Sequence, residues 1–151
     1  MRKTVYLISF LFFVFLFFLN NGHLSLDCGS YKKEKIKINN TDITVDISND
    51  NCKRKLGLSG RKSLSDNIGM LFLFEKEGRN GIWMKDMNFP IDIIWFDSDE
   101  KIILLEKNIA PETYPGVFGE DAVSKFVLEV RSGFIEENNL KIGDKMLILK
   151  D

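Results

Sequence analysis

Short apolar segments separated by turn-forming residues constrain the fold of this chain more than any other feature. Lys35–Ile38 (KIKI) and Ile43–Ile47 (ITVDI) alternate with a period of two, which is typical of strands with one buried face. Gly69–Phe74 (GMLFLF) is apolar throughout, which favours a strand at the centre of a core. The other segments that we expect to form strands are Ile82–Met84, Ile91–Phe96, Lys101–Glu106, Phe126–Val130 and Met146–Leu149.

Helical signals are few and short. Asn49 or Asp50 can cap a helix that runs to about Leu58, and Ser132 can cap another that runs to about Asn139. Because no long helices alternate with the strands, βαβ units are disfavoured. The pattern predicts a mainly β fold, a sandwich or barrel of about eight short strands with one or two short helices.

The longest expected loop is Ala110–Asp121, which contains two of the three prolines of the chain. It also carries the aromatic residues Tyr114 and Phe118. Aromatic side chains on such a loop suit the capture of a ligand or partner, and they equally suit the closing of one end of the domain. The sequence leaves both roles open.

The start of the chain has the features of a targeting segment. Arg2 and Lys3 precede Val5–Leu19 (VYLISFLFFVFLFFL), fifteen residues without a charge, and polar residues follow. As a helix this run would reach about 22 Å, short of a hydrocarbon core of about 30 Å, which favours a signal peptide. No small-residue cleavage pattern follows, so an uncleaved anchor helix is the alternative. We therefore expect residues 1–28 to be a signal peptide or an N-terminal membrane anchor.

Residues 29–151 would then form one domain outside the cytoplasm. It would be secreted, periplasmic or anchored to the membrane by residues 5–19. Export would allow Cys28 and Cys52 to form a disulfide, which contributes about 3–4 kcal/mol in the chain-entropy model. The alternative is two free thiols.

The charge balance and the scarcity of metal ligands exclude several classes of protein. The chain has 21 Lys and Arg against 22 Asp and Glu, a net charge of −1, which argues against a nucleic-acid partner. Two cysteines and one histidine exclude a zinc ribbon within one chain. His23 lies at the edge of the leader, so a Ser-His-Asp or Cys-His catalytic group is absent. We expect no metal site and no cofactor.

Several short motifs occur in order between Ile43 and Leu149. They are Arg54-x-x-Gly57-Leu58-x-Gly60-Arg61, Gly69-Met70-Leu71-Phe72-x-Phe74, Trp83-Met84-Lys85, Pro90-Ile91-Asp92, Val127-Leu128-Glu129, Gly133 and Gly143-Asp144. In this order they resemble the prokaryotic family catalogued as domain of unknown function 192. The resemblance implies a mainly β, jelly-roll-like sandwich and an exported protein, and it implies no activity. The chain departs from the family at Ser59, where Met is common, and at Asp86-Met87, where Asn-Thr is common.

The most suggestive group of candidate ligand-binding residues is Trp83, Met84, Lys85 and Asp92. Trp83 and Met84 offer an apolar wall, Lys85 a cation and Asp92 an anion. Such a group could line a pocket for a small polar-aromatic ligand or a sugar ring. The alternative is a core tryptophan beside a structural Lys–Asp pair.

Asp92 presents the clearest local conflict, because period-two alternation places its carboxylate on an apolar strand face. It needs a partner, which Lys85, Arg54 or Arg61 could provide. The two arginines flank a glycine-containing turn. They could bind an anionic group of a ligand, or they could fasten the predicted helix to the sheet.

Two functions of different classes follow from these residues. The first is an exported or membrane-tethered module that binds a small ligand or an envelope protein. The second is a small extracytoplasmic enzyme, a hydrolase or lyase on envelope glycans or peptides, in which Asp92, Lys85 and Arg54 converge on a cleft. Acid–base chemistry would then fall to Asp92 together with Glu75 or Glu129.

Overall fold

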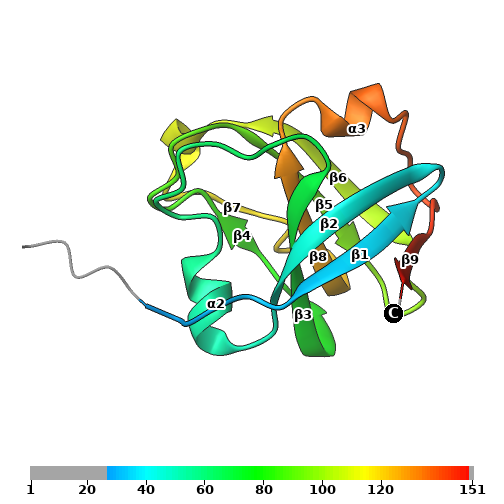
Figure 1. Cartoon of the computed structure of the whole chain (residues 1–151), viewed down its shortest axis with the longest axis horizontal. Coiled ribbons are helices and arrows are strands. Elements are labelled where there is room, and N and C mark those ends of the chain that lie inside the picture. The colour runs from blue at the N-terminus through cyan, green and yellow to red at the C-terminus, as the bar shows by residue number, and fades with distance from the viewer. Residues whose placement is uncertain (1–26, 150–151) are drawn as a thin grey trace, which may run out of the picture.

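The computed structural model describes residues 27–149 and shows a β domain built on one large, curled sheet (Figure 1). The expected signal or anchor segment at residues 5–19 lies outside the described residues. Between residues 27 and 149, no helix is long and apolar enough to span a bilayer.

Seven strands form the sheet, in the spatial order β6-β5-β8-β3-β2-β1-β9. All neighbours are antiparallel except β2 and β3, which pair in parallel. A parallel pair needs a crossover, and the helix α2 (Asn51–Leu56) lies within it. The strands are β1 (Lys33–Ile38), β2 (Thr41–Ser48), β3 (Ile68–Arg79), β5 (Ile91–Phe96), β6 (Ile102–Ile109), β8 (Val123–Arg131) and β9 (Met146–Leu149).

The sheet curls until its two outer strands approach each other. Lys101, just before β6, and Lys145, just before β9, form an antiparallel bridge. Beside it, the amide of Met146 donates a hydrogen bond to the carbonyl of Glu100 at 2.9 Å. These contacts join the two edges of the sheet at one point, so the sheet forms a half-barrel.

The mainly β class and the two short helices are confirmed, and of the two expected arrangements, a sandwich or a barrel, the described chain forms one close to a barrel. A sandwich packs two sheets face to face, whereas here one sheet encloses its own core. The parallel pairing of β2 with β3 is a second difference, because neighbouring strands in a jelly roll are antiparallel.

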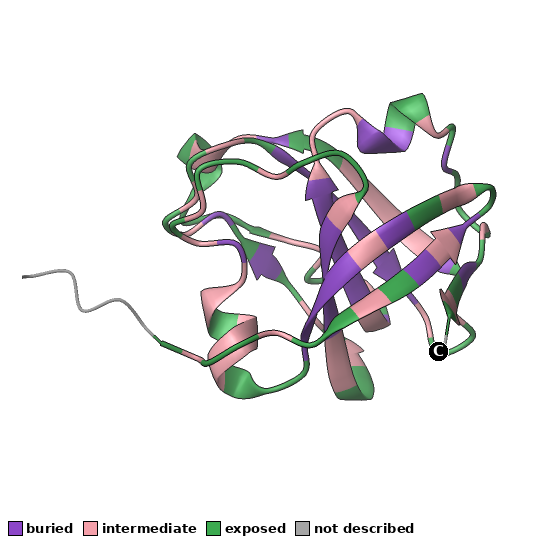
Figure 2. Cartoon of the chain, in the orientation of Figure 1, coloured by how far each residue is buried: buried purple, intermediate pink, exposed green. Residues whose placement is uncertain are grey.

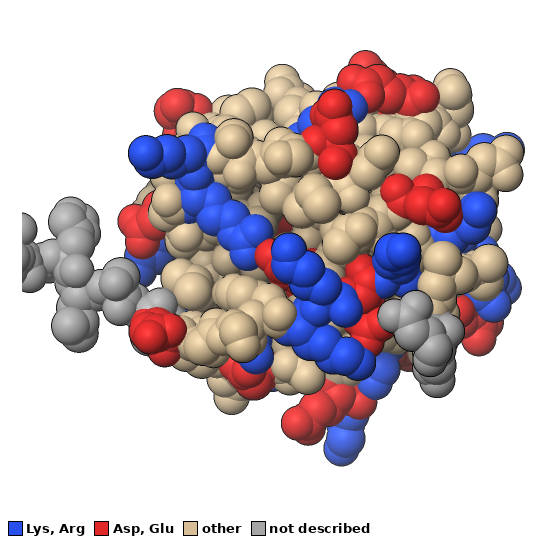
Figure 3. Space-filling view, in the orientation of Figure 1, with Lys and Arg blue, Asp and Glu red and all other residues tan. Residues whose placement is uncertain are grey.

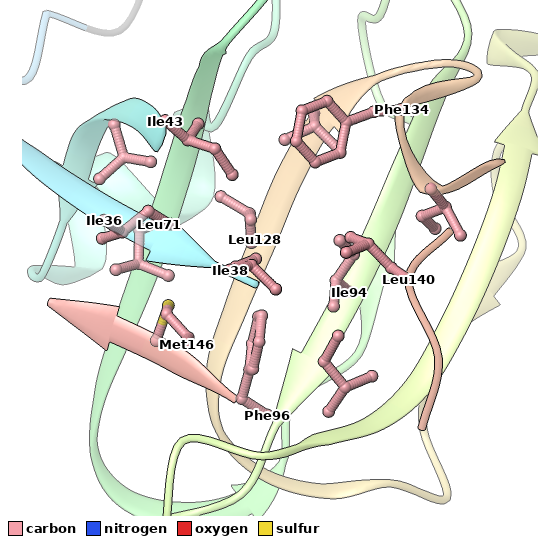
Figure 4. Close-up of a cluster of buried hydrophobic side chains, with 14 of the residues drawn as sticks. Ile36, Ile38, Ile43, Leu71, Ile94, Phe96, Leu128, Phe134, Leu140 and Met146 are labelled. Atoms are coloured by element: carbon pink, nitrogen blue, oxygen red, sulfur yellow. The ribbon is translucent and has the colours of Figure 1, made fainter. Parts of the chain in front are cut away.

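The two faces of the sheet carry separate apolar clusters. The strand β5 is buried along its whole length (Figure 2), so it contributes to both. Ile94 and Phe96 point into the curl and join the inner cluster (Figure 4). Ile93 and Trp95 point to the outer face and join the second cluster. This alternation follows from the two-residue period of a strand, and it decides which side chains can meet.

A second layer covers part of the outer face. It consists of α2 and a small sheet of β4 (Ile82–Trp83) and β7 (Val117–Phe118), which lie on the same side of the domain in Figure 1. The strand β7 lies in the segment expected as a long loop, where the short 3-10 helix η1 (Pro111–Thr113) also forms. Phe118 packs on the outer cluster, whereas Tyr114 remains exposed.

The two helices begin in different ways. The carboxylate of Asp50 caps α2 by accepting the amide of Lys53 at 2.8 Å, and Gly57 ends the helix with a positive φ of 52°. The helix α3 (Phe134–Glu137) follows Gly133 and has no side-chain cap, so the expectation that Ser132 caps it is wrong. The Ser132 hydroxyl instead donates to Oδ1 of Asn108 at 2.7 Å.

A disulfide between Cys28 and Cys52 ties the start of the described chain to α2. Replacing both cysteines with serine should lower the free energy of unfolding by about 3 kcal/mol, since the bond closes a loop with a sequence separation of 24. Denaturant unfolding with and without reductant measures this change. Reductant should destabilise the native chain and leave the double variant unchanged. Equal stability of the native chain in both conditions would contradict a structural role for the bond.

Candidate functional site

A glutamate in the middle of the sheet is the most unusual polar group in the described part of the chain. Glu129 lies on β8 between Met70 of β3 and Ile93 of β5, and its side chain is on the outer face. Only 4% of its surface is exposed, and its Oε2 atom is buried without a hydrogen-bond partner among residues 27–149. An unpaired buried carboxyl is costly, so it calls for an explanation.

Burial raises the pKa of Glu129 to about 8. The loss of hydration is the main cause, since it disfavours the charged form, and the positive charge of Arg61 lowers the pKa in part. The carboxyl is therefore mostly protonated at neutral pH and can both donate and accept a hydrogen bond. A carboxyl with a strongly shifted pKa in a pocket is a recognised mark of a functional site.

A small pocket of about 50 Å³ opens above this carboxyl. Its walls come from the last turn of α2, the loop after it, β3 and β4. The helix ends close to the glutamate, since a Cβ built on Gly57 would lie 3.9 Å from Oε2, at ordinary contact distance. The lining residues are Arg54, Lys55, Leu56, Gly57, Leu58, Ser59, Phe72, Gly81, Ile82, Trp83, Met87 and Glu129.

Hydrogen bonds hold two of the surrounding loops together. The hydroxyl of Ser59 donates to the carbonyl of Lys85 at 2.8 Å, and the amide of Gly60 donates to the carbonyl of Asp86 at 2.9 Å. Ser59 stands where the resembling family often has Met, and Met87, another departure, lines the pocket. These bonds link the loop after α2 to the loop after β4, so the pocket has a defined shape.

The three neighbours Trp83, Met84 and Lys85 have different environments. Trp83 lines the pocket and is 42% exposed, so it is not the core residue of the alternative interpretation. Met84 is buried in the outer cluster and does not line the pocket. The Nζ atom of Lys85 lies 5.8 Å from the centre of the Trp83 ring. Tyr114 meets the same ring edge-on, with 6.0 Å between the centroids.

Both candidate arginines lie near the pocket and are held by other groups. Arg54 lines it, donates to the carbonyl of Leu73 at 2.9 Å and donates to Oδ1 of Asn51 at 2.7 Å. Arg61 donates to Oδ2 of Asp46 at 2.8 Å. Both therefore fasten the layer of α2 to the sheet.

Asp92 belongs to the opposite face of the sheet from Glu129, and this corrects the expected grouping. Its neighbour across the strands is Val130 of the inner cluster, whereas Glu129 pairs with Ile93. The two carboxylate oxygens of Asp92 accept backbone amides, from Asn108 at 2.8 Å and from Ile135 at 2.9 Å. Neither Lys85 nor an arginine is its partner, because a lysine or arginine in the outer layer cannot reach through the sheet.

The sequence indicated Glu129 only as a possible acid–base partner of Asp92, although its strand carries a stronger signal. In Phe126–Val130 (FVLEV), the glutamate is the one polar residue of a strand that reads as buried. A strand between two packed faces has no solvated side for such a residue. A conflict of this kind marks either a buried pair or a site, and the absence of an ion pair for Glu129 within residues 27–149 favours a site.

Two other features of the described region carry less information. No group of three or more His, Cys, Asp or Glu side chains between residues 27 and 149 could hold a metal ion. A second hollow, beside Gly81, is lined by Arg79, Val117, Glu120 and Asp121. Its acidic side chains are exposed, so it has no counterpart of the buried Glu129.

Comparisons with known proteins assign a family and a fold. Residues 34–148 match the model of a family described as DUF192, "Uncharacterized ACR". A crystal structure from Sinorhizobium meliloti 1021, described as a "putative transcription regulator", is 26% identical and has a TM-score of 0.76; the match covers 81% of this chain and 98% of that one. A protein of unknown function from Novosphingobium aromaticivorans DSM 12444 shares the fold at 21% identity and a TM-score of 0.74, over 82% of this chain and 91% of that one. No curated protein matches the chain significantly.

Proposed function

The chain belongs to the DUF192 family, as its motifs indicated, and we propose that it is an exported or membrane-tethered module that binds a small polar ligand over Glu129. The family carries no assigned activity, so this function is inferred from the pocket of the chain itself. The observation that carries the proposal is the buried carboxyl of Glu129, a residue that lines the pocket and whose Oε2 atom has no partner in the described chain. A ligand that donates a hydrogen bond there would satisfy an atom that the fold leaves unpaired.

The residues around the pocket support binding more than catalysis. Glu129 is the only carboxylate among the described residues that line it. Hydrolysis of a glycosidic bond ordinarily uses a pair of carboxyl groups, one as acid and one as base or nucleophile. The alternative enzyme required Asp92 beside Lys85 and Arg54, and Asp92 is bonded to backbone amides on the other face of the sheet.

The location outside the cytoplasm rests on two features. Val5–Leu19 has the length and flanks of an export segment, and Arg2 and Lys3 would keep its start in the cytoplasm. The pairing of Cys28 with Cys52 suits an oxidising compartment. Protease treatment of spheroplasts that carry a C-terminally tagged chain tests this for an anchored chain, and the periplasmic fraction and culture medium are probed for a released one. The tag should be digested without lysis of the spheroplasts or be found outside them, and a tag that stays protected inside until lysis would contradict the proposed location.

Saturable binding without turnover tests the function itself. The full chain is titrated by calorimetry with a panel of sugars, amino acids, nucleosides and short peptides. At least one compound should bind, and both Glu129→Leu, which removes the hydrogen-bonding carboxyl, and Trp83→Ala should weaken its binding at least tenfold. Val123→Ala, which removes an exposed side chain away from the pocket, is the matched control and should bind as the native chain does. Binding that is unaffected by both pocket variants, or conversion of the bound compound, would overturn the proposal.

A further inference from the structure

The size of the pocket restricts what can enter it. About 50 Å³ accommodates a few water-sized groups, whereas whole ligands usually occupy several hundred Å³. A substituent such as a hydroxyl or hydroxymethyl group can therefore reach Glu129. The body of the ligand has to remain at the mouth, where Trp83 is exposed.

The state of Glu129 restricts the chemistry of that substituent. A protonated carboxyl donates one hydrogen bond and accepts others, and a hydroxyl group does the same. The two groups therefore complement each other without a net charge in the pocket. An ammonium group would need the ionised carboxylate and would have to pass Arg54 and Lys55, which line the same pocket.

The mouth offers an aromatic surface. Trp83 and Tyr114 are 42% and 44% exposed, and their rings meet edge-on at 6.0 Å. The face of an aromatic ring carries partial negative charge, and the C–H groups on the face of a sugar ring carry partial positive charge. A pyranose can thus stack at the mouth while one of its hydroxyl groups enters the pocket.

Two lysines add a positive charge beside this surface. Lys55 lines the pocket, and the Nζ atom of Lys85 lies 5.8 Å from the centre of the Trp83 ring. Neither forms a salt bridge with another residue in the described chain. Ammonium groups without an acidic partner at the edge of a stacking surface favour a ligand that carries an anionic group. Other faces of the domain also carry basic side chains, which form a band across the view in Figure 3.

Resting on the proposed function, we propose that the ligand is an acidic sugar, bound with a hydroxyl group on Glu129, its ring against Trp83 and its carboxylate near Lys55 and Lys85. Each of these contacts comes from a different segment: β8 of the main sheet, and β4, α2 and the loop after β4 in the layer above it. The two lysines attract the carboxylate of an acidic sugar, which a neutral sugar lacks, and they repel the ammonium group of an amino sugar.

Titration of the full chain with three matched monosaccharides tests the inference. The probes are D-glucuronic acid, D-glucose and D-glucosamine. Binding is followed by the change in tryptophan emission, which reports on the exposed Trp83 because Trp95 is buried and its surroundings stay the same. Glucuronic acid should bind three- to fivefold more tightly than glucose, as expected for a partly exposed ion pair, and glucosamine should bind least. Added salt should weaken glucuronic acid binding and leave glucose binding unchanged.

Variants separate the contacts. Lys85→Gln combined with Lys55→Gln should remove the preference for glucuronic acid while binding of glucose persists, and Glu129→Leu should weaken the binding of both sugars. Lys141→Gln, an exposed lysine outside the pocket, is the control and should retain the preference.

The outcomes distinguish this inference from the function on which it rests. Equal binding of glucuronic acid and glucose, or tightest binding of glucosamine, would overturn the acidic sugar and leave a ligand pocket in place. If none of the sugars binds but another compound of the panel does, and its binding depends on Glu129, the acidic sugar is likewise overturned and the ligand pocket remains. No Glu129-dependent binding of any compound would overturn both.

Discussion

Replacement of Glu129 with glutamine should remove most of the pH dependence of stability above pH 5. The pKa of Glu129 is raised to about 8 in the folded chain from an ordinary value of 4.5, so the folded state binds more protons than the unfolded state between these values. Stability contributed by the protonated carboxyl is therefore complete below about pH 4.5 and is lost as the pH rises through 8. Between pH 5 and pH 9 the native chain should lose about 4 kcal/mol relative to the variant.

Denaturant unfolding of both chains at several pH values measures this difference. Any effect of the glutamine side chain on stability that does not vary with pH cancels in the comparison. Glu112→Gln is the matched control, because Glu112 is exposed and should not alter the pH profile of the native chain. Parallel pH profiles for the native chain and Glu129→Gln would show that Glu129 is solvated or paired. A ligand that donates to Oε2 should also change the profile, which connects the stability measurement to the pocket.

Replacement of Asp92 with alanine should lower the free energy of unfolding by about 4 kcal/mol, because two buried charge-assisted hydrogen bonds disappear together. Asp92 is fully buried, and its oxygens accept the amides of Asn108 and Ile135. Without the carboxylate, both amides lose their acceptor inside the fold. One of them belongs to β6 and the other to the start of α3, so the loss should loosen the joint between the sheet and this helix.

Thermal and denaturant unfolding measure the effect of Asp92→Ala, and Asp92→Asn provides an intermediate case because it keeps one strong acceptor. Asp99→Ala, at an exposed turn, is the control and should be close to the native chain. A loss below about 1 kcal/mol for Asp92→Ala would mean that water replaces the carboxylate. The pocket should still bind its ligand in any folded Asp92 variant, because Asp92 lies on the other face of the sheet.

The contrast between these two acidic residues explains why one is structural and the other is a candidate for function. Both are buried in neighbouring strands of the same sheet. Asp92 has a backbone donor for each of its oxygens, whereas Oε2 of Glu129 has none in the described chain. A carboxylate with all its acceptors satisfied stabilises the fold, and one left unpaired next to a pocket is available to a ligand.

Local patterns in the sequence were sufficient for most of the secondary structure. Period-two alternation located β1 and β2, because alternate side chains of a strand face opposite sides whatever the strand pairs with, and short, mainly apolar segments between turn residues located β3, β5 and β8. The cap at Asp50 and the end of α2 at Gly57 were also expected from their residue types. The small strands β4 and β7 were only half anticipated, because a pair of two-residue strands leaves almost no period to detect.

The sequence by itself determined the family, the mainly β class and several of the candidate site residues, among them Trp83 and Arg54, because these depend on residue types and short spacings. The tertiary structure alone decided how the strands pair and on which face each polar group lies. Seven strands pair into one sheet whose two edges meet at the bridge of Lys101 and Lys145, and the register of β5 with β8 separates Asp92 from Glu129. Pairing between distant segments is selected by the packing of the whole chain, and a shift of one residue reverses every face. The pocket forms only where α2, β4 and β8 come together in the fold, so no local pattern of the sequence indicates it.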